Sequence, residues 1–261
     1  MRQMVNELVE YRHLLFMLTW RDIKIRYKQS IMGFFWAILM PLLVVSAGVL
    51  IRHVFSIFSG QSINLIDVAS LAVKAVPWAF FVGSIRFATT SLTGNTNLVT
   101  KIYFPREIFP FSAVLANLFD LGIASIIVIL MIAIAGVGVG LHLLWLPLLL
   151  ILLIFLTAAL AMLLSCGNLF FRDVKYIVEV FLTFGIFFTP VFYEARMLGK
   201  WTHLILLNPL APLLEAINDV AVLQRSPDPF WLAYSGAWAL GGFFFSWIIF
   251  SKAESAFAEN I

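Results

Sequence analysis

Residues 21–36 read RDIKIRYKQSIMGFFW, and this stretch decides how the rest of the chain is organised. Four of its side chains are basic, and after Lys28 no charged residue occurs until Arg52. A basic strip followed at once by a long apolar run is typical of a chain that leaves a cytoplasmic surface and enters the hydrocarbon of a membrane. The stretch therefore predicts the start of a first transmembrane helix.

The composition of the whole chain supports this interpretation. Its 261 residues are 62% hydrophobic and 12% charged, whereas a soluble domain is roughly half apolar and roughly a quarter charged. The net charge of +3 does not indicate a nucleic-acid partner, because the cations cluster at the ends of apolar segments. Cys166 is the only cysteine, so no internal disulfide can form. We expect an integral membrane protein.

Six apolar segments are candidates for membrane-spanning helices. Residues 194–228 differ from them, because their apolar pieces are short and are interrupted by Pro209 and Pro212, which is typical of a re-entrant or interfacial helical segment. The sequence predicts an all-α integral membrane protein with a single domain, residues 1–261. The expected spans are residues 33–51, a helix within 68–99, and residues 108–139, 143–169, 176–192 and 230–250.

Residues 1–30 precede the six-helix region, residues 31–261. Apolar side chains recur in them near helical spacing and alternate with charged ones, which predicts an amphipathic helix in the membrane interface. Two roles stay open for this helix: a lipid-surface anchor, or a lever that a cytoplasmic partner grips. Most loop cations fall on the side of the amino terminus, so both termini are expected to be cytoplasmic.

Sequence motifs of the common catalytic sites are missing. The chain has no G-x-x-x-x-G-K-[S/T] phosphate loop, no H-E-x-x-H and no G-x-S-x-G, and its four histidines are far apart. We therefore expect no catalytic, cofactor-binding or metal-binding residues in this chain, and we do not expect an enzyme.

Two charges fall inside the predicted spans. Arg86 lies 15 residues before Lys101 (101 − 86), and Asp120 lies 14 residues after Arg106 (120 − 106). If both segments are helical, the two charges are at similar depth, roughly 20 Å above the turn that joins their helices. A lone charge at that depth is costly, so we expect Arg86 and Asp120 to form an ion pair. The pair would either pin the two helices together or line a translocation path.

Aromatic residues make up 15% of the chain. Most are expected to face lipid or to form belts at the membrane surfaces. Others could line a pore and hold sugar rings by stacking. The candidates for such a pore are Phe34, Phe35, Trp36, Phe184, Phe187, Phe188, Phe192 and Tyr193.

Five motifs, spread in order over nearly the whole chain, resemble those of ABC-2 type permeases. They are RDIKIRYKQS at 21–30, YFPRE at 103–107, FRDV at 171–174, TPVFY at 189–193 and NPLAP at 208–212. Together they are similar to the branch of that family that exports lipid-linked polysaccharides: O antigen, capsule and teichoic acid. An ABC-2 permease for a lipid or a drug is the alternative. A stand-alone channel or ion-coupled carrier is less well supported, because neither inverted repeats nor paired acidic residues are evident in the spans.

The resemblance implies a homodimer in the bacterial inner membrane that binds two copies of a cytoplasmic ATPase. ATP and Mg²⁺ would bind to that partner and not to this chain. The substrate would be an undecaprenyl-type lipid-linked glycan that crosses at the homodimer interface, with residues 194–228 capping the outer mouth. The residues expected to couple the chain to its ATPase are Arg21, Asp22, Lys24, Arg26, Lys28, Lys101, Tyr103, Pro105, Arg106 and Glu107.

Overall fold

The computed structural model describes residues 9–28, 35–59, 64–101 and 104–257. Over these ranges the chain is all-α, with helices joined by short turns and no strand. The predicted fold class is therefore confirmed at the level of an all-helical protein.

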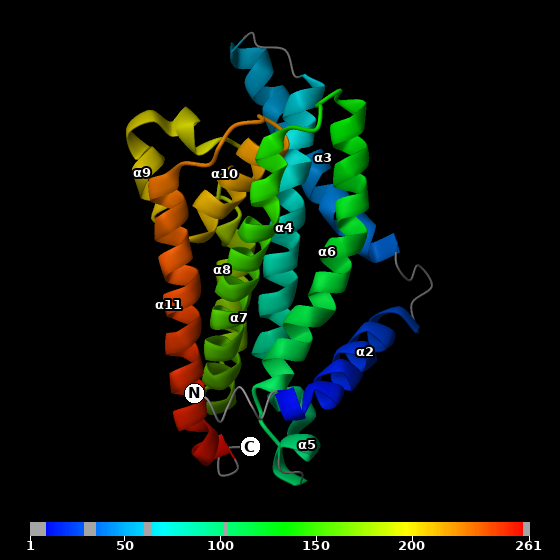
Figure 1. Cartoon of the computed structure of the whole chain (residues 1–261), viewed down its shortest axis with the longest axis vertical. Coiled ribbons are helices and arrows are strands. Elements are labelled where there is room, and N and C mark those ends of the chain that lie inside the picture. The colour runs from blue at the N-terminus through cyan, green and yellow to red at the C-terminus, as the bar shows by residue number, and fades with distance from the viewer. Residues whose placement is uncertain (1–8, 29–34, 60–63, 102–103, 258–261) are drawn as a thin grey trace.

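Five helices of the described ranges are long and apolar enough to cross a membrane. At ~1.5 Å per residue, a helix of 25 residues exceeds the ~30 Å thickness of the hydrocarbon core. Figure 1 shows them as a bundle in which α4 lies in the middle. The five helices are α3 (Phe35–Ser59), α4 (Leu65–Thr89), α6 (Ile108–Ile134), α7 (Leu146–Phe170) and α11 (Pro229–Ala253).

The fifth expected span is not found, because the segment predicted at 176–192 forms a shorter helix. Helix α8 runs from Val174 to Gly185, and its 12 residues reach about 18 Å, well short of the hydrocarbon core. Gly185 lets the chain pass close to the Trp78 ring, and Pro190, four residues after Ile186, offers no backbone N–H to continue a helix. The apolar composition that continues to Phe192 belongs to turns.

The shorter elements lie at the two ends of the bundle (Figure 1). The α5 end holds η1 (Thr93–Asn95), α5 (Thr96–Lys101) and η4 (Glu254–Ala256), together with the end of α11. The α9 end holds η2 (Leu141–Trp145), η3 (Ala195–Trp201) and α9 (Thr202–Leu206), with α10 (Leu210–Ala221) beneath them. Helix α2 (Arg12–Lys28) slants along the lower part of α6.

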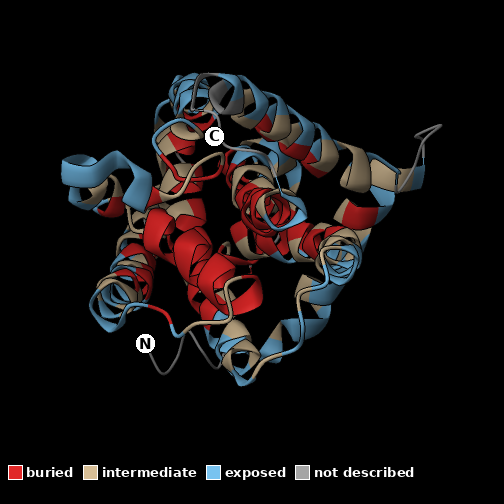
Figure 2. Cartoon of the chain, turned by 90° about the horizontal axis from the view of Figure 1, so that it is seen from above, coloured by how far each residue is buried: buried red, intermediate tan, exposed pale blue. Residues whose placement is uncertain are grey.

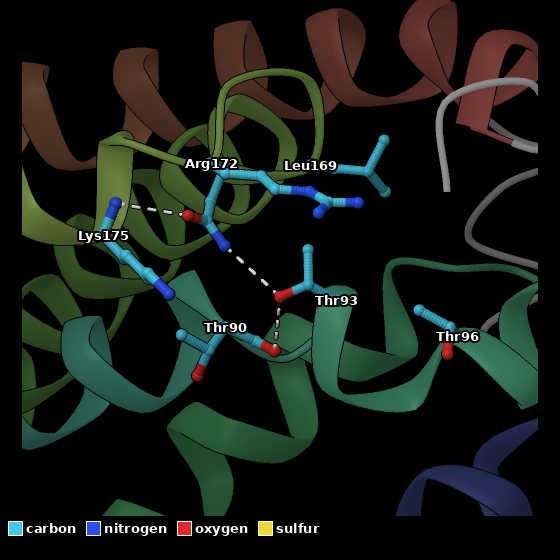
Figure 3. Close-up of a pocket in the computed structure, with 7 residues that line it drawn as sticks. Thr90, Thr93, Thr96, Leu169, Arg172 and Lys175 are labelled. Carbon is cyan, nitrogen blue, oxygen red and sulfur yellow. Dashed lines mark hydrogen bonds between the residues drawn. The ribbon is translucent and has the colours of Figure 1, made fainter.

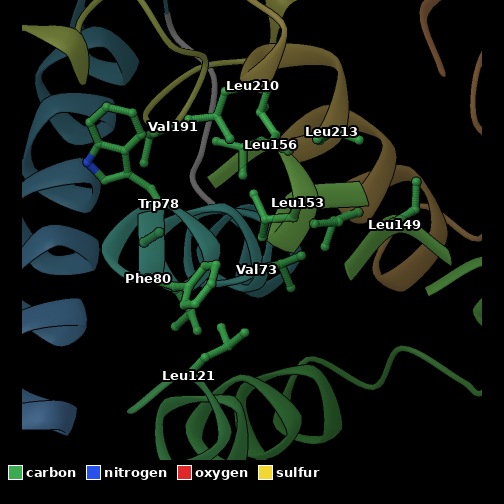
Figure 4. Close-up of a cluster of buried hydrophobic side chains, with 14 of the residues drawn as sticks. Val73, Trp78, Phe80, Leu121, Leu149, Leu153, Leu156, Val191, Leu210 and Leu213 are labelled. Atoms are coloured by element: carbon green, nitrogen blue, oxygen red, sulfur yellow. The ribbon is translucent and has the colours of Figure 1, made fainter. Parts of the chain in front are cut away.

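The core lies between α4, α6, α7 and α10. Figure 4 shows side chains from all four helices interdigitating, among them Val73, Leu121, Leu153 and Leu213. Every residue of α10 is buried, because this helix packs against α4, α7 and α11. Seen from above, the buried segments gather in the middle of the bundle and the exposed ones surround it (Figure 2).

Several helix boundaries follow from local chemistry. Helix α11 begins where the Asp228 carboxylate accepts hydrogen bonds from the backbone N–H groups of Phe230 and Trp231, with Pro229 at the first helical position. Helix α3 continues through Pro41 and ends at Ser59, beyond the end of the span predicted at 33–51.

Candidate functional site

Helix α2 docks on α6 through one side. Leu18 and Ile23 are its buried apolar side chains, and Ser112 of α6 donates a hydrogen bond of 3.2 Å to the Asp22 carboxylate. The opposite side is exposed and mixes apolar Met17 and Trp20 with basic Lys24 and Lys28. The predicted helix is confirmed, but its polar and apolar residues do not separate onto two faces as an amphipathic helix requires.

The carboxyl end of α2 is held by a polar cluster on α6. The Arg26 Nη1 donates hydrogen bonds to Asp120 Oδ2 (2.8 Å) and to Asn117 Oδ1 (3.0 Å). The Tyr27 hydroxyl donates to the other carboxylate oxygen of Asp120. We call Arg26, Tyr27, Asn117 and Asp120 the α2 latch, because they join two segments more than 90 residues apart in the chain.

A contact with α4 and a shift in the pKa of Tyr27 further characterise the latch. The Arg26 guanidinium lies over the ring of Phe87 on α4, 3.7 Å from the ring centroid, so α2 also touches the central helix. Burial raises the pKa of the Tyr27 phenol well above its ordinary value, and the hydrogen bond to Asp120 raises it further. A tyrosine phenol is protonated at neutral pH in any case, and the raised pKa means that Tyr27 remains a donor to Asp120 in more alkaline solution as well.

A cavity of about 560 Å³ adjoins the latch. Its lining includes the charged residues Arg26, Asp120 and Arg86 as well as Trp36 and Pro41 of α3. Helices α2, α3, α4 and α6 therefore line a space with both charged and apolar side chains. Such a lining suits an amphiphilic guest better than a small polar one.

Gly83 allows α4 to approach α6 beside the latch. A Cβ atom at this position would lie 2.6 Å from Asn117 Oδ1, which cannot easily move because Asn117 also donates a 2.7 Å hydrogen bond to the Ala113 carbonyl. We therefore expect Gly83→Ala to cost about 1–3 kcal/mol of stability through overpacking. SDS-induced unfolding in mixed micelles would measure this change.

The double variant Gly83→Ala/Asn117→Ala provides the control. Removing the amide removes the clash, so its cost should be clearly smaller than the sum of the two single costs. Strictly additive costs would show that Gly83 does not act through Asn117.

The expected ion pair between Arg86 and Asp120 is wrong. Arg86 pairs instead with Glu179 of α8, with Nε–Oε1 and Nη2–Oε2 distances of 2.7 and 2.9 Å. Asp120 pairs with Arg26. Arg86 of α4 is therefore paired with α8, and Asp120 of α6 is paired with α2.

The axial register of α4 and α6 explains the difference. Gly83 lies opposite Asn117, and the two helices run in opposite directions. Arg86 is three residues from that level toward the α5 end, and Asp120 is three residues from it toward the α9 end. At ~1.5 Å per residue the two positions are about 9 Å apart along the bundle. The chain between Arg86 and Lys101 is not one continuous helix, so counting residues from the turn misplaced Arg86.

The predicted pore aromatics fall into two groups. Phe184, Phe187 and Phe188 are exposed on α8 and the turn after it, and Phe35 and Trp36 are exposed at the start of α3. Phe192 and Tyr193 are half-buried, and the Tyr193 hydroxyl donates a 3.0 Å hydrogen bond to the Phe187 carbonyl. Phe34 lies outside the described residues. Exposed aromatic side chains are what a glycan path would need, and their role in lining such a path stays a prediction.

The predicted coupling residues are also divided. Arg21, Lys24 and Lys28 are on the accessible side of α2, although Arg21 also pairs with its neighbour Asp22. Tyr103 lies outside the described residues, as does the side chain of Lys101. Their contribution to coupling stays a prediction.

The turn before α6 packs against the end of α11 and is less accessible than expected. Pro105 and Glu107 are buried, and Arg106 Nη1 donates a 2.6 Å hydrogen bond to the Glu254 carbonyl. The Ser251 hydroxyl donates to Glu107 at 3.4 Å. Arg106 and Glu107 hold the turn to η4 and to the end of α11, so any role of these residues in coupling would be through the position of that turn.

A buried ion pair at the α9 end was not anticipated from the sequence. Lys74 of α4 is fully buried, and its ammonium group donates hydrogen bonds to the Tyr193 carbonyl (2.5 Å) and to Glu215 Oε1 (3.4 Å). The Ala195 N–H donates to the same carboxylate oxygen at 3.2 Å. The sequence signal for this pair was the presence of a Lys and a Glu within largely apolar helices, since buried charges need partners.

Within the described residues no group of three His, Cys, Asp or Glu side chains is placed to hold a metal ion. The polar clusters of this chain thus join helices to one another.

Comparison with known proteins gives these features a context. The chain is 29% identical, over an alignment covering 100% of both proteins, to the O-antigen export system permease protein RfbA of Myxococcus xanthus. It is 27% and 28% identical, over 79% of each chain, to two proteins of that name from Klebsiella pneumoniae. A family profile described as ABC-2 type transporter matches residues 13–221, from α2 through α10. With most of the chain matched and several membrane-spanning helices present, this multi-pass membrane protein belongs to the ABC-2 type transporter family.

Proposed function

We propose that this chain is the membrane subunit of an ATP-driven exporter of lipid-linked polysaccharide, such as O antigen, across the inner membrane. The observation that carries the proposal is the full-length similarity to a protein named as an O-antigen export permease. Two copies of the chain would form the conduit, and a separate ATPase would bind each copy at the α5 end. That end and both termini would then be cytoplasmic.

The exposed Arg86–Glu179 pair supports a conduit between two copies. The two side chains are 49% and 45% exposed, and Arg86 lies about one turn before α4 ends at Thr89. An exposed ion pair is stable in contact with water or with a second protein surface, so this part of the face is better suited to them than to hydrocarbon. The exposed aromatic residues of α8 continue from the same helix toward the α9 end.

A polysaccharide needs such a lined path, because a polymer of hydroxyl groups cannot cross hydrocarbon. Aromatic faces let sugar rings stack and slide, whereas an ion pair to every sugar unit would stall the polymer. The α2 latch would link the conduit to its motor: a push on α2 from the ATPase reaches α6 through Arg26 and Asp120, and α4 through Phe87.

An export assay tests the proposal. In cells that lack their own copy, this chain and its ATPase should restore surface polysaccharide, and a phosphate-loop variant of the ATPase should abolish it. Replacing Phe184, Phe187 and Phe188 together by Ala should reduce export at least roughly 10-fold, equivalent to about 1.4 kcal/mol on the barrier. Immunoblotting of surface glycan gives the measurement.

The matched control replaces Phe230, Phe244 and Phe245 by Ala, three exposed phenylalanines of α11. This variant loses the same apolar surface from another helix and should export normally. Equal export by both triple variants would reject the aromatic path, and export independent of the ATPase would reject the proposed function itself.

A further inference from the structure

A polar pocket of about 340 Å³ lies at the α5 end, apart from the α2 latch. It is formed where the turn after α4 meets the turn between α7 and α8. Figure 3 shows Arg172 and Lys175 extending from one side toward Thr90 and Thr93 on the other. Seven residues line the pocket: Thr90, Thr93, Thr96, Asn168, Leu169, Arg172 and Lys175.

The three threonines gather because of the local backbone. They are spaced three residues apart across a turn, η1 and the start of α5. A 3₁₀ helix has three residues per turn, so residues at this spacing lie above one another on one face. The three threonines thereby form one wall of the pocket, in which the Thr90 hydroxyl donates to the Phe87 carbonyl (3.4 Å) and the Thr93 hydroxyl donates to the Thr90 carbonyl (3.2 Å).

Asn168 holds the two turns in register. It is 2% exposed, its Nδ2 donates a 3.3 Å hydrogen bond to Thr93 Oγ1, and its Oδ1 accepts a 3.2 Å hydrogen bond from the Lys175 N–H. One buried amide therefore fixes the threonine wall relative to the basic wall. The pocket is built by the fold and does not depend on flexible surface side chains alone.

The pocket is positively charged. Neither Arg172 nor Lys175 forms an ion pair with a carboxylate in the part of the chain that the structure describes. Both side chains are exposed, and the Lys175 ammonium rests 4.8 Å from the ring centroid of Tyr176. Asp173 lies between them in sequence but does not line the pocket.

We infer that this pocket binds a phosphate group, as a phosphomonoester or a pyrophosphate. A guanidinium and an ammonium at the rim of one polar pocket match a multiply charged oxyanion, and a guanidinium can bind two of its oxygens at once. The pocket lies at the ends of α4 and α7, at the level where a membrane helix leaves hydrocarbon for the lipid headgroups. The ligand can come from a lipid headgroup or from a soluble phosphate.

Binding of inorganic pyrophosphate to the full chain in phosphatidylcholine nanodiscs tests the inference. Isothermal titration calorimetry at fixed ionic strength should show saturable binding to a single site. Arg172→Gln/Lys175→Gln should weaken this binding at least roughly 10-fold, because both charge-assisted contacts are lost. Thr90→Val should leave it nearly unchanged, because the Thr90 hydroxyl already donates to the Phe87 carbonyl, and Arg172→Lys should retain part of it because the charge remains.

The matched control is Arg12→Gln/Lys200→Gln, which removes one arginine and one lysine from exposed positions elsewhere. It should bind pyrophosphate as the parent does. Absence of saturable binding by the parent, or equal weakening by both double variants, would overturn the inference. Thermal unfolding of each variant in the same nanodiscs shows that the comparison is between folded proteins.

A second set of nanodiscs distinguishes the sources. If a lipid headgroup reaches the pocket, phosphatidic acid in the bilayer should displace pyrophosphate. If only soluble phosphate reaches it, phosphatidic acid should leave the titration unchanged. Saturable binding of pyrophosphate supports the site in both cases. If the parent binds no pyrophosphate but binds its ATPase through Arg172 and Lys175, a protein carboxylate is the ligand and the phosphate assignment is wrong. The test needs neither glycan nor ATP, so its outcome is separate from that of the proposed function.

Discussion

Lys74→Ala is expected to lower the free energy of unfolding by roughly 3–5 kcal/mol, the cost of leaving one member of a buried ion pair without its partner. Lys74 has no exposed side-chain surface, and the Glu215 side chain is 12% exposed, so water cannot replace the lost ammonium. The Tyr193 carbonyl loses its donor as well. SDS-induced unfolding in mixed micelles measures the loss.

Two further variants show whether the pair itself is responsible. Lys74→Met/Glu215→Leu replaces both charges by apolar groups, and it should recover most of the lost stability because no charge is left buried. Lys200→Ala removes an exposed lysine and should be close to neutral. If the double variant is less stable than Lys74→Ala, then an unpaired buried charge is not the main cost of the single substitution, and the ion pair itself stabilises the fold.

Asp120→Asn is expected to loosen α2 from the bundle. The substitution keeps the shape of the side chain but removes the charge that Arg26 and Tyr27 contact. A hydrogen bond to a charged group contributes roughly 1.5–3 kcal/mol, so the ratio of docked to undocked α2 should fall roughly 10- to 100-fold. Amide hydrogen exchange measures this ratio even when the undocked state is rare, and the α2 amides should exchange faster by that factor.

Amides of α11 in the same protein provide the internal reference, and they should exchange as in the parent. Asp173→Asn, which alters an exposed aspartate far from α2 in the sequence, is the matched substitution and should not change exchange in α2. Faster exchange throughout the bundle in Asp120→Asn would mean that Asp120 supports the whole fold. Unchanged exchange in α2 would mean that the latch does not hold it.

The long helices could be predicted from the sequence because each is specified locally. An uninterrupted apolar run longer than the hydrocarbon is thick can satisfy its backbone only as a helix, whatever its neighbours do. Helix α8 shows the limit of this argument. Its apolar composition continues to Phe192, but the close contact of Gly185 with Trp78 and the missing N–H of Pro190 end the helix early.

The site was predicted less completely, because it consists of contacts between helices. Arg26 was expected to couple the chain to its ATPase and Asp120 to pair with Arg86, whereas the pairing of Arg26 with Asp120 depends on how α2 lies across α6. Lys74 was not linked to Glu215, which is 141 residues away in the chain. No local pattern connects residues at such separations.

By itself the sequence determined that the chain is a helical membrane protein, where most of its spanning helices lie and which family it resembles. These properties follow from hydropathy, from the placement of cations and from short motifs, all of which are local. The tertiary structure alone decided the partners of Arg86, Asp120 and Lys74, the short length of α8 and the pocket between two turns. These depend on axial register and depth of packing, because a charge inside a bundle pairs with whichever opposite charge the fold brings within reach.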